Sequence, residues 1–183
     1  GDTLMTPIQM AVTYAAIANG GTIWKPWIAR AIVDPKGKVV KEFGSQKVGQ
    51  SEQTKADTAF LRKALRAVTT SGTAAGVFSG FPVEVAGKTG TGQDLGRNKN
   101  GTAKDDTSWF ASFAPASNPQ YAVIMVVSQG GFGATTSAVG VRDIYSEIFG
   151  VTGGKIDPTK SAFPNGIPTG LPKLDVKNAT LDG

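Results

Sequence analysis

The run VAGKTGTGQ at residues 85–93 constrains the fold of this chain more than any other stretch. It begins as an apolar strand and continues into Lys88, followed by the hydroxyl side chains of Thr89 and Thr91 with glycines between and after them. A lysine and hydroxyls can line a site for an anion, and glycines leave room for a ligand to lie against the backbone. The run therefore predicts a strand that holds a carboxylate-bearing ligand along its edge.

Two more apolar segments, at residues 109–114 and 121–128, follow the predicted strand 83–93. A polar loop at 94–106 precedes the first, and the turn PASNP at 115–119 joins the two. Strands that follow one another with short links usually pair as antiparallel neighbours. We therefore expect the three strands to form an antiparallel meander.

Helices are expected to pack on this sheet, and the first begins close to the start of the chain. Thr6 is placed as its N-cap, Pro7 suits the first turn, and Gln9 stands where a capping box needs it. An alanine-rich stretch continues to Asn19, and two glycines end the helix.

A second helix is predicted from Thr54 and Asp57 to about residues 70–72, and a third over 138–149. Helical spacing places one set of apolar residues on each inner face. The second helix would bury Phe60, Leu61, Ala64, Leu65 and Val68, and the third Val141, Ile144, Tyr145 and Ile148. An antiparallel sheet with packed helices belongs to the α+β class.

The remaining segments are a hairpin and a tail. Residues 23–43 are rich in β-branched and aromatic side chains, and DPKG at 34–37 is typical of a type I turn. From residue 151 to 183 the chain is rich in proline and glycine, so we expect an extended tail that is ordered only where it lies on the body. We accordingly divide the chain into a domain at 1–150 and a tail at 151–183.

Composition excludes several kinds of chemistry. The 183 residues include no cysteine and no histidine, which rules out disulfides, thiol nucleophiles and Ser-His-Asp catalysis and argues against zinc. Proton transfer must then use lysine, carboxylates, tyrosine or water. We expect no cofactor and no metal ion. The net charge of +5 comes from scattered basic residues, which does not indicate a nucleic-acid partner and suits an anionic substrate.

Three interpretations of the lysine strand compete. A phosphate-binding loop would need a glycine where Pro82 stands and a helix starting at Lys88, so this interpretation is disfavoured. An ordinary exposed strand with a solvated lysine is the simplest alternative. In the third, the strand binds the substrate of a serine acyltransferase: Lys88 anchors the ligand electrostatically, the threonine hydroxyls donate to its carboxylate, and Gly90 keeps the edge clear.

The sequence at 87–91, GKTGT, resembles the K-T-G motif of penicillin-binding proteins and serine β-lactamases. The segments LMTPIQMA at 4–11 and YAAIANGG at 14–21 resemble the helix that precedes this motif in class B penicillin-binding proteins. DTSWFASFAP at 106–115 is similar to the strand that follows it. The resemblance spans about residues 2–150 and is greatest to the elongation-type, penicillin-binding protein 2-like branch, which favours the third interpretation.

The resemblance implies a D,D-transpeptidase that joins peptidoglycan stem peptides through a serine acyl-enzyme and is inhibited by β-lactam antibiotics. It assigns catalytic and substrate-binding roles to Lys88 and Thr89, which would contact the substrate terminus and support the proton relay. Gly90 would border the ligand. Thr91 would bind the carboxylate through its hydroxyl and supply the backbone N–H of the oxyanion hole.

One departure from the family pattern is large: the chain has no S-x-x-K and no S-x-N motif. Thr22 and Thr152 each stand three residues before a lysine, so they match only the spacing of S-x-x-K. In Ser117-Asn118 the asparagine follows the serine directly, one residue too early for S-x-N. We therefore expect the C-terminal part of a penicillin-binding, serine β-lactamase-like transpeptidase fold, with the nucleophile on an upstream part of the same protein.

The resemblance also implies partners and a location. These are stem peptides, β-lactams, the upstream part carrying S-x-x-K and S-x-N, and a membrane glycosyltransferase of the elongation machinery. The protein would lie on the extracytoplasmic face of a bacterial membrane, anchored through a missing N-terminal segment. A β-lactamase, a penicillin-sensing domain or a non-catalytic cell-wall binding module are the alternatives, and the sequence upstream of Gly1 would distinguish them. We assign no catalytic role to Trp109, Asp105 or Asp106.

Overall fold

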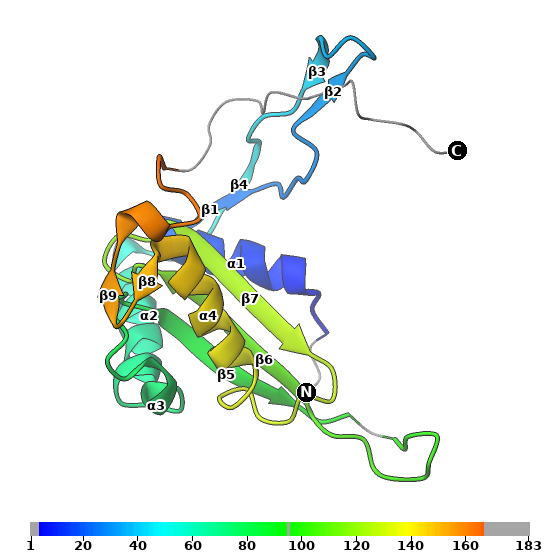
Figure 1. Ribbon diagram of the computed structural model, residues 1–183, viewed down its shortest axis with the longest axis vertical. Helices are drawn as coiled ribbons and strands as arrows, with labels where there is room; N and C mark the ends of the chain where they lie inside the picture. Colours follow the sequence, from blue (N-terminus) through cyan, green and yellow to red (C-terminus); the bar gives the residue numbers. More distant parts are fainter. Residues whose placement is uncertain (1–3, 95, 167–183) are drawn as a thin grey trace.

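The three predicted strands form one antiparallel sheet in the order β5-β6-β7 (Figure 1). The structure is a computed structural model that describes residues 4–94 and 96–166. β5 spans Ala86–Gly92, β6 Thr107–Ala114 and β7 Tyr121–Val127. The register places Lys88 opposite Ala111. The predicted meander and the α+β class are confirmed.

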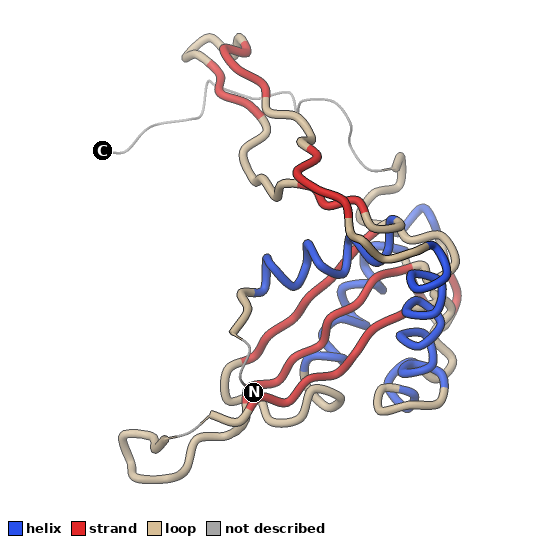
Figure 2. Tube along the Cα trace, turned by 180° about the vertical axis from the view of Figure 1, so that it is seen from behind, coloured by secondary structure: helices blue, strands red, loops and turns tan. Residues whose placement is uncertain are grey.

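Helices cover both faces of this sheet (Figures 1 and 2). α1, Pro7–Asn19, packs on one face and α4, Ser137–Phe149, on the other. α2, Lys55–Thr70, lies along β5, and the short α3, Ala75–Phe78, connects it to the sheet. α3 has no counterpart among the predicted elements, because four residues show too little periodicity to be recognised.

Local capping signals fix where the first two helices begin. Thr6 and Gln9 form a reciprocal capping box at the start of α1, and Thr54 and Asp57 do the same at the start of α2. The Thr54 hydroxyl and then its backbone N–H lower the pKa of the Asp57 carboxyl. α1 ends at Gly20, whose φ of 87° is left-handed. These boundaries are as predicted.

The predicted inner face of α2 is wrong in part. Phe60 is 70% exposed and Ala64 is also exposed. The residues of α2 that are fully buried are Thr58 and Thr69. The reason is a polar contact: the Thr69 hydroxyl and the Arg66 guanidinium donate to the backbone oxygen of Val85, at 2.5 and 3.2 Å. α2 turns so that these donors, rather than Phe60, face the strand.

The core has two parts because β6 is buried on both faces. Phe110 packs with Phe78, Val141 and Tyr145 on the α4 side, and Ala111 and Phe113 pack with Tyr14 on the α1 side. Burial raises the pKa of the Tyr14 phenol to about 12 and also raises the pKa of Tyr145. On α4, Val141 and Tyr145 are buried as predicted, but Ile144 faces outward and is 41% exposed.

The predicted hairpin is present as an arm that projects from the body, at residues 22–50 (Figures 1 and 2). β2, Ala31–Val33, pairs with β3, Val39–Glu42, across the predicted turn. At the base of the arm β1, Thr22–Trp24, pairs with β4, Lys47–Gln50. β4 was not predicted. None of residues 22–50 is fully buried.

Beyond Gly150 the described chain remains against the body as far as residue 166. Two short strands, β8 at Val151–Thr152 and β9 at Lys155–Ile156, pair before the 3₁₀ turn η1 at Pro158–Lys160. The Phe163 ring then stacks on Tyr121 of β7, with centroids 6.1 Å apart. Residues 167–183 of the predicted tail lie outside the described residues. Across 4–94 and 96–166, no helix combines the length and hydrophobicity needed to cross a bilayer.

Gly87 provides a test of this packing. A Cβ added there would lie 2.7 Å from the Ala111 oxygen and 2.8 Å from the Phe110 ring. Gly87→Ala should therefore destabilise the sheet by about 1–3 kcal/mol, the usual cost of overpacking. Thermal unfolding followed by circular dichroism measures the effect. Gly44→Ala is the control, because nothing lies within 4 Å of its Cβ position. Equal melting temperatures for the two variants would contradict the packing described.

Candidate functional site

The candidate site is the outer edge of β5. β6 occupies one edge of the strand, and β5 ends the strand order of the sheet. On the other side α2 is held to the residue just before the strand through the Val85 oxygen. From Lys88 onward, no strand among the described residues pairs with this edge. An unpaired strand edge can accept an extended peptide-like ligand.

Side chains of β5 alternate between the two faces of the sheet. Ala86 belongs to the cluster on the α1 side, whereas the Cβ position of Gly87 points at Phe110 on the α4 side. Lys88 and Gly90 therefore emerge on the α1 side, and Thr89 and Thr91 on the α4 side. The four predicted site residues flank the edge from both faces.

The Lys88 side chain is exposed and folds back over the edge. Its ammonium donates to the Thr89 backbone oxygen at 2.8 Å and lies 3.4 Å from the Thr89 hydroxyl oxygen. The lysine charge is thus placed beside a hydroxyl of the same strand. The two residues together present a cation and an O–H group at one point of the edge.

Thr89 has a second neighbour that the sequence did not indicate. The hydroxyl oxygens of Thr89 and Thr73 are 2.8 Å apart, and Thr73 lies in the turn between α2 and α3. The two residues are 16 positions apart. The sequence did not identify Thr73 as a site residue, because a single threonine after a helix is typical of an ordinary turn. The only local signal is the SGT sequence at 71–73, directly after the predicted end of the helix.

Thr91 is exposed and is bordered by the glycine-rich segment GGFG at residues 130–133, which follows β7. The Gly133 N–H lies 3.4 Å from the Thr91 hydroxyl oxygen. A Cβ on Gly133 would be only 2.5 Å from the Gly90 oxygen, so the backbones are in close contact. Beside this contact the ring of Phe132 is 68% exposed. Residues 130–133 therefore form a wall next to the strand.

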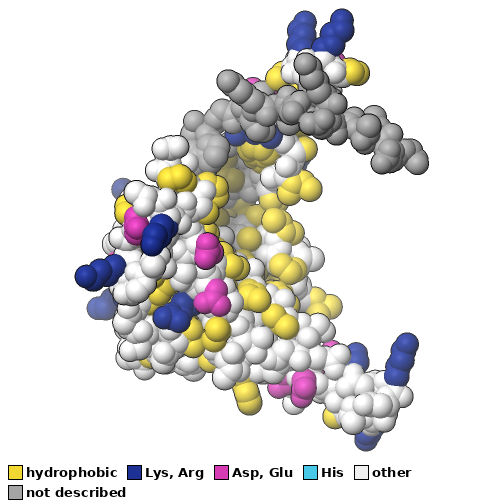
Figure 3. Space-filling view, in the orientation of Figure 1, with side chains coloured by type: hydrophobic (Ala, Val, Ile, Leu, Met, Phe, Trp, Pro, Cys, Tyr) yellow, Lys and Arg dark blue, Asp and Glu magenta, His cyan; other side chains and the backbone are white. Residues whose placement is uncertain are grey.

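Apolar side chains remain uncovered on the α1 face of the sheet, where α1 packs on β6 and β7. Figure 3 shows the body hollowed below the projecting arm, with hydrophobic side chains gathered along the hollow in the region of α1. Leu4, which precedes α1, and Ile8, in its first turn, are 95% and 53% exposed. Trp109 is half-buried on the face that carries Lys88. This face has room for further polypeptide.

The serines of β6 and of the start of α4 are not free to act as nucleophiles. Ser108, Ser112 and Ser137 are fully buried. The Ser108 and Ser137 hydroxyls share a hydrogen bond of 2.7 Å, and Ser112 shares one of 3.0 Å with the Tyr145 hydroxyl. These serines serve the packing of α4 on the sheet.

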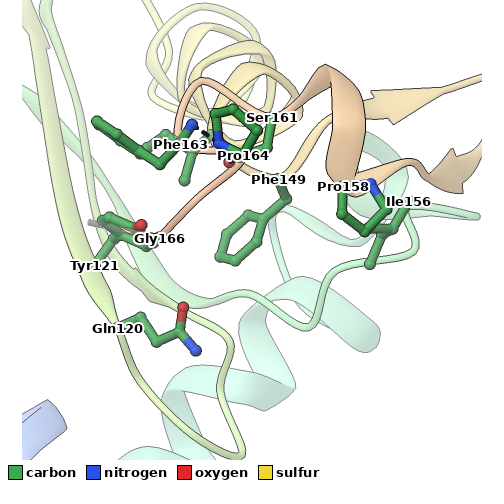
Figure 4. A pocket seen from close by; sticks show the side chains of 10 residues that line it. Gln120, Tyr121, Phe149, Ile156, Pro158, Ser161, Phe163, Pro164 and Gly166 are labelled. Atoms are coloured by element: carbon green, nitrogen blue, oxygen red, sulfur yellow. Dashed lines mark hydrogen bonds between the residues drawn. The ribbon is translucent and has the colours of Figure 1, made fainter. Parts of the chain in front are cut away.

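A pocket of about 380 Å³ lies elsewhere (Figure 4). Tyr121, Phe149 and Phe163 line it, together with Pro158 and Ser161. It is mostly apolar and contains none of the predicted site residues. The lining of this pocket therefore does not favour it over the edge of β5 as the candidate site.

Comparisons with known proteins agree with the resemblance seen in the sequence. The family model described as the penicillin binding protein transpeptidase domain matches residues 1–148. Among curated proteins, Stage V sporulation protein D of Bacillus subtilis is 35% identical over 148 residues, covering 76% of this chain and 22% of that protein. Penicillin-binding protein 2A of the same organism is 31% identical over 131 residues, covering 67% of this chain and 18% of that protein.

Solved structures give the same picture. Penicillin-binding protein 2 of Pseudomonas aeruginosa, in complex with WCK 5153, has a TM-score of 0.66 at 28% identity and covers 86% of this chain and 32% of that one. The imipenem acyl-enzyme of penicillin-binding protein A from Mycobacterium tuberculosis shares the fold, with a TM-score of 0.64 at 23% identity over 80% of this chain and 31% of that one. The chain thus spans less than a third of each of these relatives.

Proposed function

The chain belongs to the family of penicillin-binding protein transpeptidase domains, and from this premise we propose that it is the C-terminal part of a serine D,D-transpeptidase. The reaction is the cross-linking of peptidoglycan stem peptides, with β-lactams as inhibitors. The observation that carries the proposal is the open edge of β5, where Lys88, Thr89 and Thr91 are available to an anionic, extended ligand.

In the first half-reaction, the site residues hold the carboxylate of the substrate and stabilise the oxyanion. The terminal D-Ala carboxylate lies against Lys88 and the hydroxyls of Thr89 and Thr91. A serine of the upstream part attacks the penultimate D-Ala carbonyl, and the Thr91 N–H stabilises the resulting oxyanion. The bond to the terminal D-Ala breaks, its amine takes the proton, and an acyl-enzyme remains. The amine of a second stem peptide attacks this ester, which forms the cross-link and frees the serine.

Placing the nucleophile outside this chain is supported by two observations. No serine precedes a lysine at the S-x-x-K spacing. The serines on β6 and at the start of α4 are buried and hydrogen-bonded to one another or to Tyr145, on the side opposite Lys88. The uncovered face beside Trp109 offers a surface on which an upstream part of the domain can pack.

The partners and location follow from the family in the same way. We propose stem peptides and β-lactams as ligands, and an extracytoplasmic position on a bacterial membrane with an anchor upstream of this chain. A membrane glycosyltransferase of the elongation machinery is the proposed protein partner, because the sequence resembles the penicillin-binding protein 2 branch. A β-lactamase, a penicillin-sensing domain or a non-catalytic binding module has no specific observation in its favour.

The first test uses this chain alone. Incubation of the 183 residues with a penicillin should leave their mass unchanged, because no serine with an activating lysine is present. Intact-mass spectrometry makes the measurement, with the full-length protein as the control that gains one acyl group. An acylated serine anywhere within the chain would refute the placement of the nucleophile upstream.

The second test compares two variants of the full-length protein. Lys88→Ala removes a positive charge at the strand edge and should lower the second-order rate of acylation about 100-fold. Thr91→Val deletes a hydroxyl but keeps the backbone N–H, so its loss should be smaller, about tenfold. A fluorescent penicillin reports both rates.

Lys63→Ala, which changes an exposed lysine of α2, is the matched control and should acylate at the parent rate. Parent rates for both Lys88→Ala and Thr91→Val would show that β5 is not the substrate strand.

A further inference from the structure

Thr73 touches the candidate site without belonging to the lysine strand. Its hydroxyl oxygen is 2.8 Å from that of Thr89, and either oxygen can be the donor. Both threonines retain contact with solvent. Through this hydroxyl pair the α2–α3 turn is linked to a side chain of the strand edge.

The fold fixes the position of Thr73 on both sides. The backbone N–H of Gly72 donates to the Ala67 oxygen at 2.9 Å, and that of Ala74 donates to the Val68 oxygen at 3.0 Å. Ala74 is fully buried in the core. α2 is in turn held to the start of the strand through the Val85 oxygen. These bonds fix the backbone on either side of Thr73, and its β-branched side chain has few rotamers through which the hydroxyl can move.

The inventory of donors and acceptors separates two directions for this hydrogen bond, and its geometry allows both. A lysine ammonium only donates, and a threonine oxygen has two lone pairs and one proton. In one direction, Lys88 donates to one lone pair of Thr89 and Thr73 donates its hydroxyl proton to the second. The Thr89 proton then has no acceptor in this group and is free for a ligand. In the opposite direction, Thr89 would donate its hydroxyl proton to Thr73 and could not donate it to an anion.

We propose that Thr73 is a positioning residue for the proposed acylation reaction. It donates its hydroxyl proton to Thr89 and thereby orients the Thr89 O–H toward the carboxylate of the ligand. This inference rests on the proposed function, because it requires a carboxylate ligand at β5. Thr73 itself does not touch the ligand, so its effect passes through Thr89.

The experiment measures second-order acylation of the full-length protein by a fluorescent penicillin. Thr73→Val keeps the shape of the side chain and removes the donor, so acylation should slow about fivefold, the effect of one hydrogen bond. Thr73→Ser restores the donor and should recover the parent rate within about twofold. Thr70→Val is the control, because the Thr70 hydroxyl bonds only to backbone oxygens of its own helix, those of Arg66 and Ala67. The melting temperature should be unchanged in all three variants.

Two further measurements separate positioning from a general structural effect. In a Thr89→Val background, Thr73→Val should cause no further loss, because the residue acts through a hydroxyl that is already absent. With a penicillin whose carboxylate is esterified, Thr73→Val and the parent should react at equal rates.

Any of three results overturns the proposal. Thr73→Val could be acylated at the parent rate, or the losses of Thr73→Val and Thr89→Val could add up in the double variant. Thr73→Val could also lose as much rate with the esterified penicillin as with the free carboxylate. A parent protein that is not acylated at all would instead refute the proposed function.

Discussion

The pairing of β5 with β6 is the constraint on which the site depends. β6 is buried on both faces, so each of its side chains is committed to one face of the sheet. Phe110 must face α4, and Ala111 and Phe113 must face α1. A slip of one residue would exchange these side chains between the two cores, which register specificity forbids. The same register then sets Lys88 opposite Ala111 and Thr91 opposite Ser108. Hydrophobic packing of the central strand thus places the polar groups of the outer one.

Hydroxyl groups serve two opposite purposes around this sheet. Ser108, Ser112 and Tyr145 are buried, and each has a hydroxyl partner. A buried hydroxyl without a partner would cost free energy, so these networks are closed. The hydroxyls of Thr89 and Thr91 border solvent, where an unfilled donor costs little. Burial, more than residue type, therefore distinguishes the hydroxyls that stabilise the fold from those that are available to bind a ligand.

The sequence predicted the parts of the fold that local signals determine. Capping boxes at Thr6 and Thr54, the turn at 34–37 and the apolar runs gave helices, hairpin and meander close to their observed positions. The errors occur where distant contacts decide. Helical periodicity predicted that Phe60 faces the core. The backbone oxygen of Val85 needs hydrogen-bond donors, however, and α2 directs Thr69 and Arg66 toward it instead.

The same limit applies to the site. Lys88, Thr89, Gly90 and Thr91 were identified from their motif, and their catalytic and binding roles remain predictions. Thr73 was missed because its relation to Thr89 exists only after α2 has docked on the strand. Conversely, β5 is recognisable because the residues of its edge are consecutive. A motif reveals groups that are adjacent along the chain, and packing must supply the rest.

The distribution of charge changes how anion binding at β5 should be understood. Residues 22–50 contain six basic and two acidic side chains, so the projecting arm accounts for four of the five net positive charges of the chain. Charges on exposed segments are screened over about 8 Å at physiological salt. The net charge of +5 therefore does not describe the surroundings of the strand. Lys88 stands on the strand itself, with its ammonium 3.4 Å from the Thr89 hydroxyl oxygen, so its attraction for a carboxylate at β5 is local and does not depend on the arm.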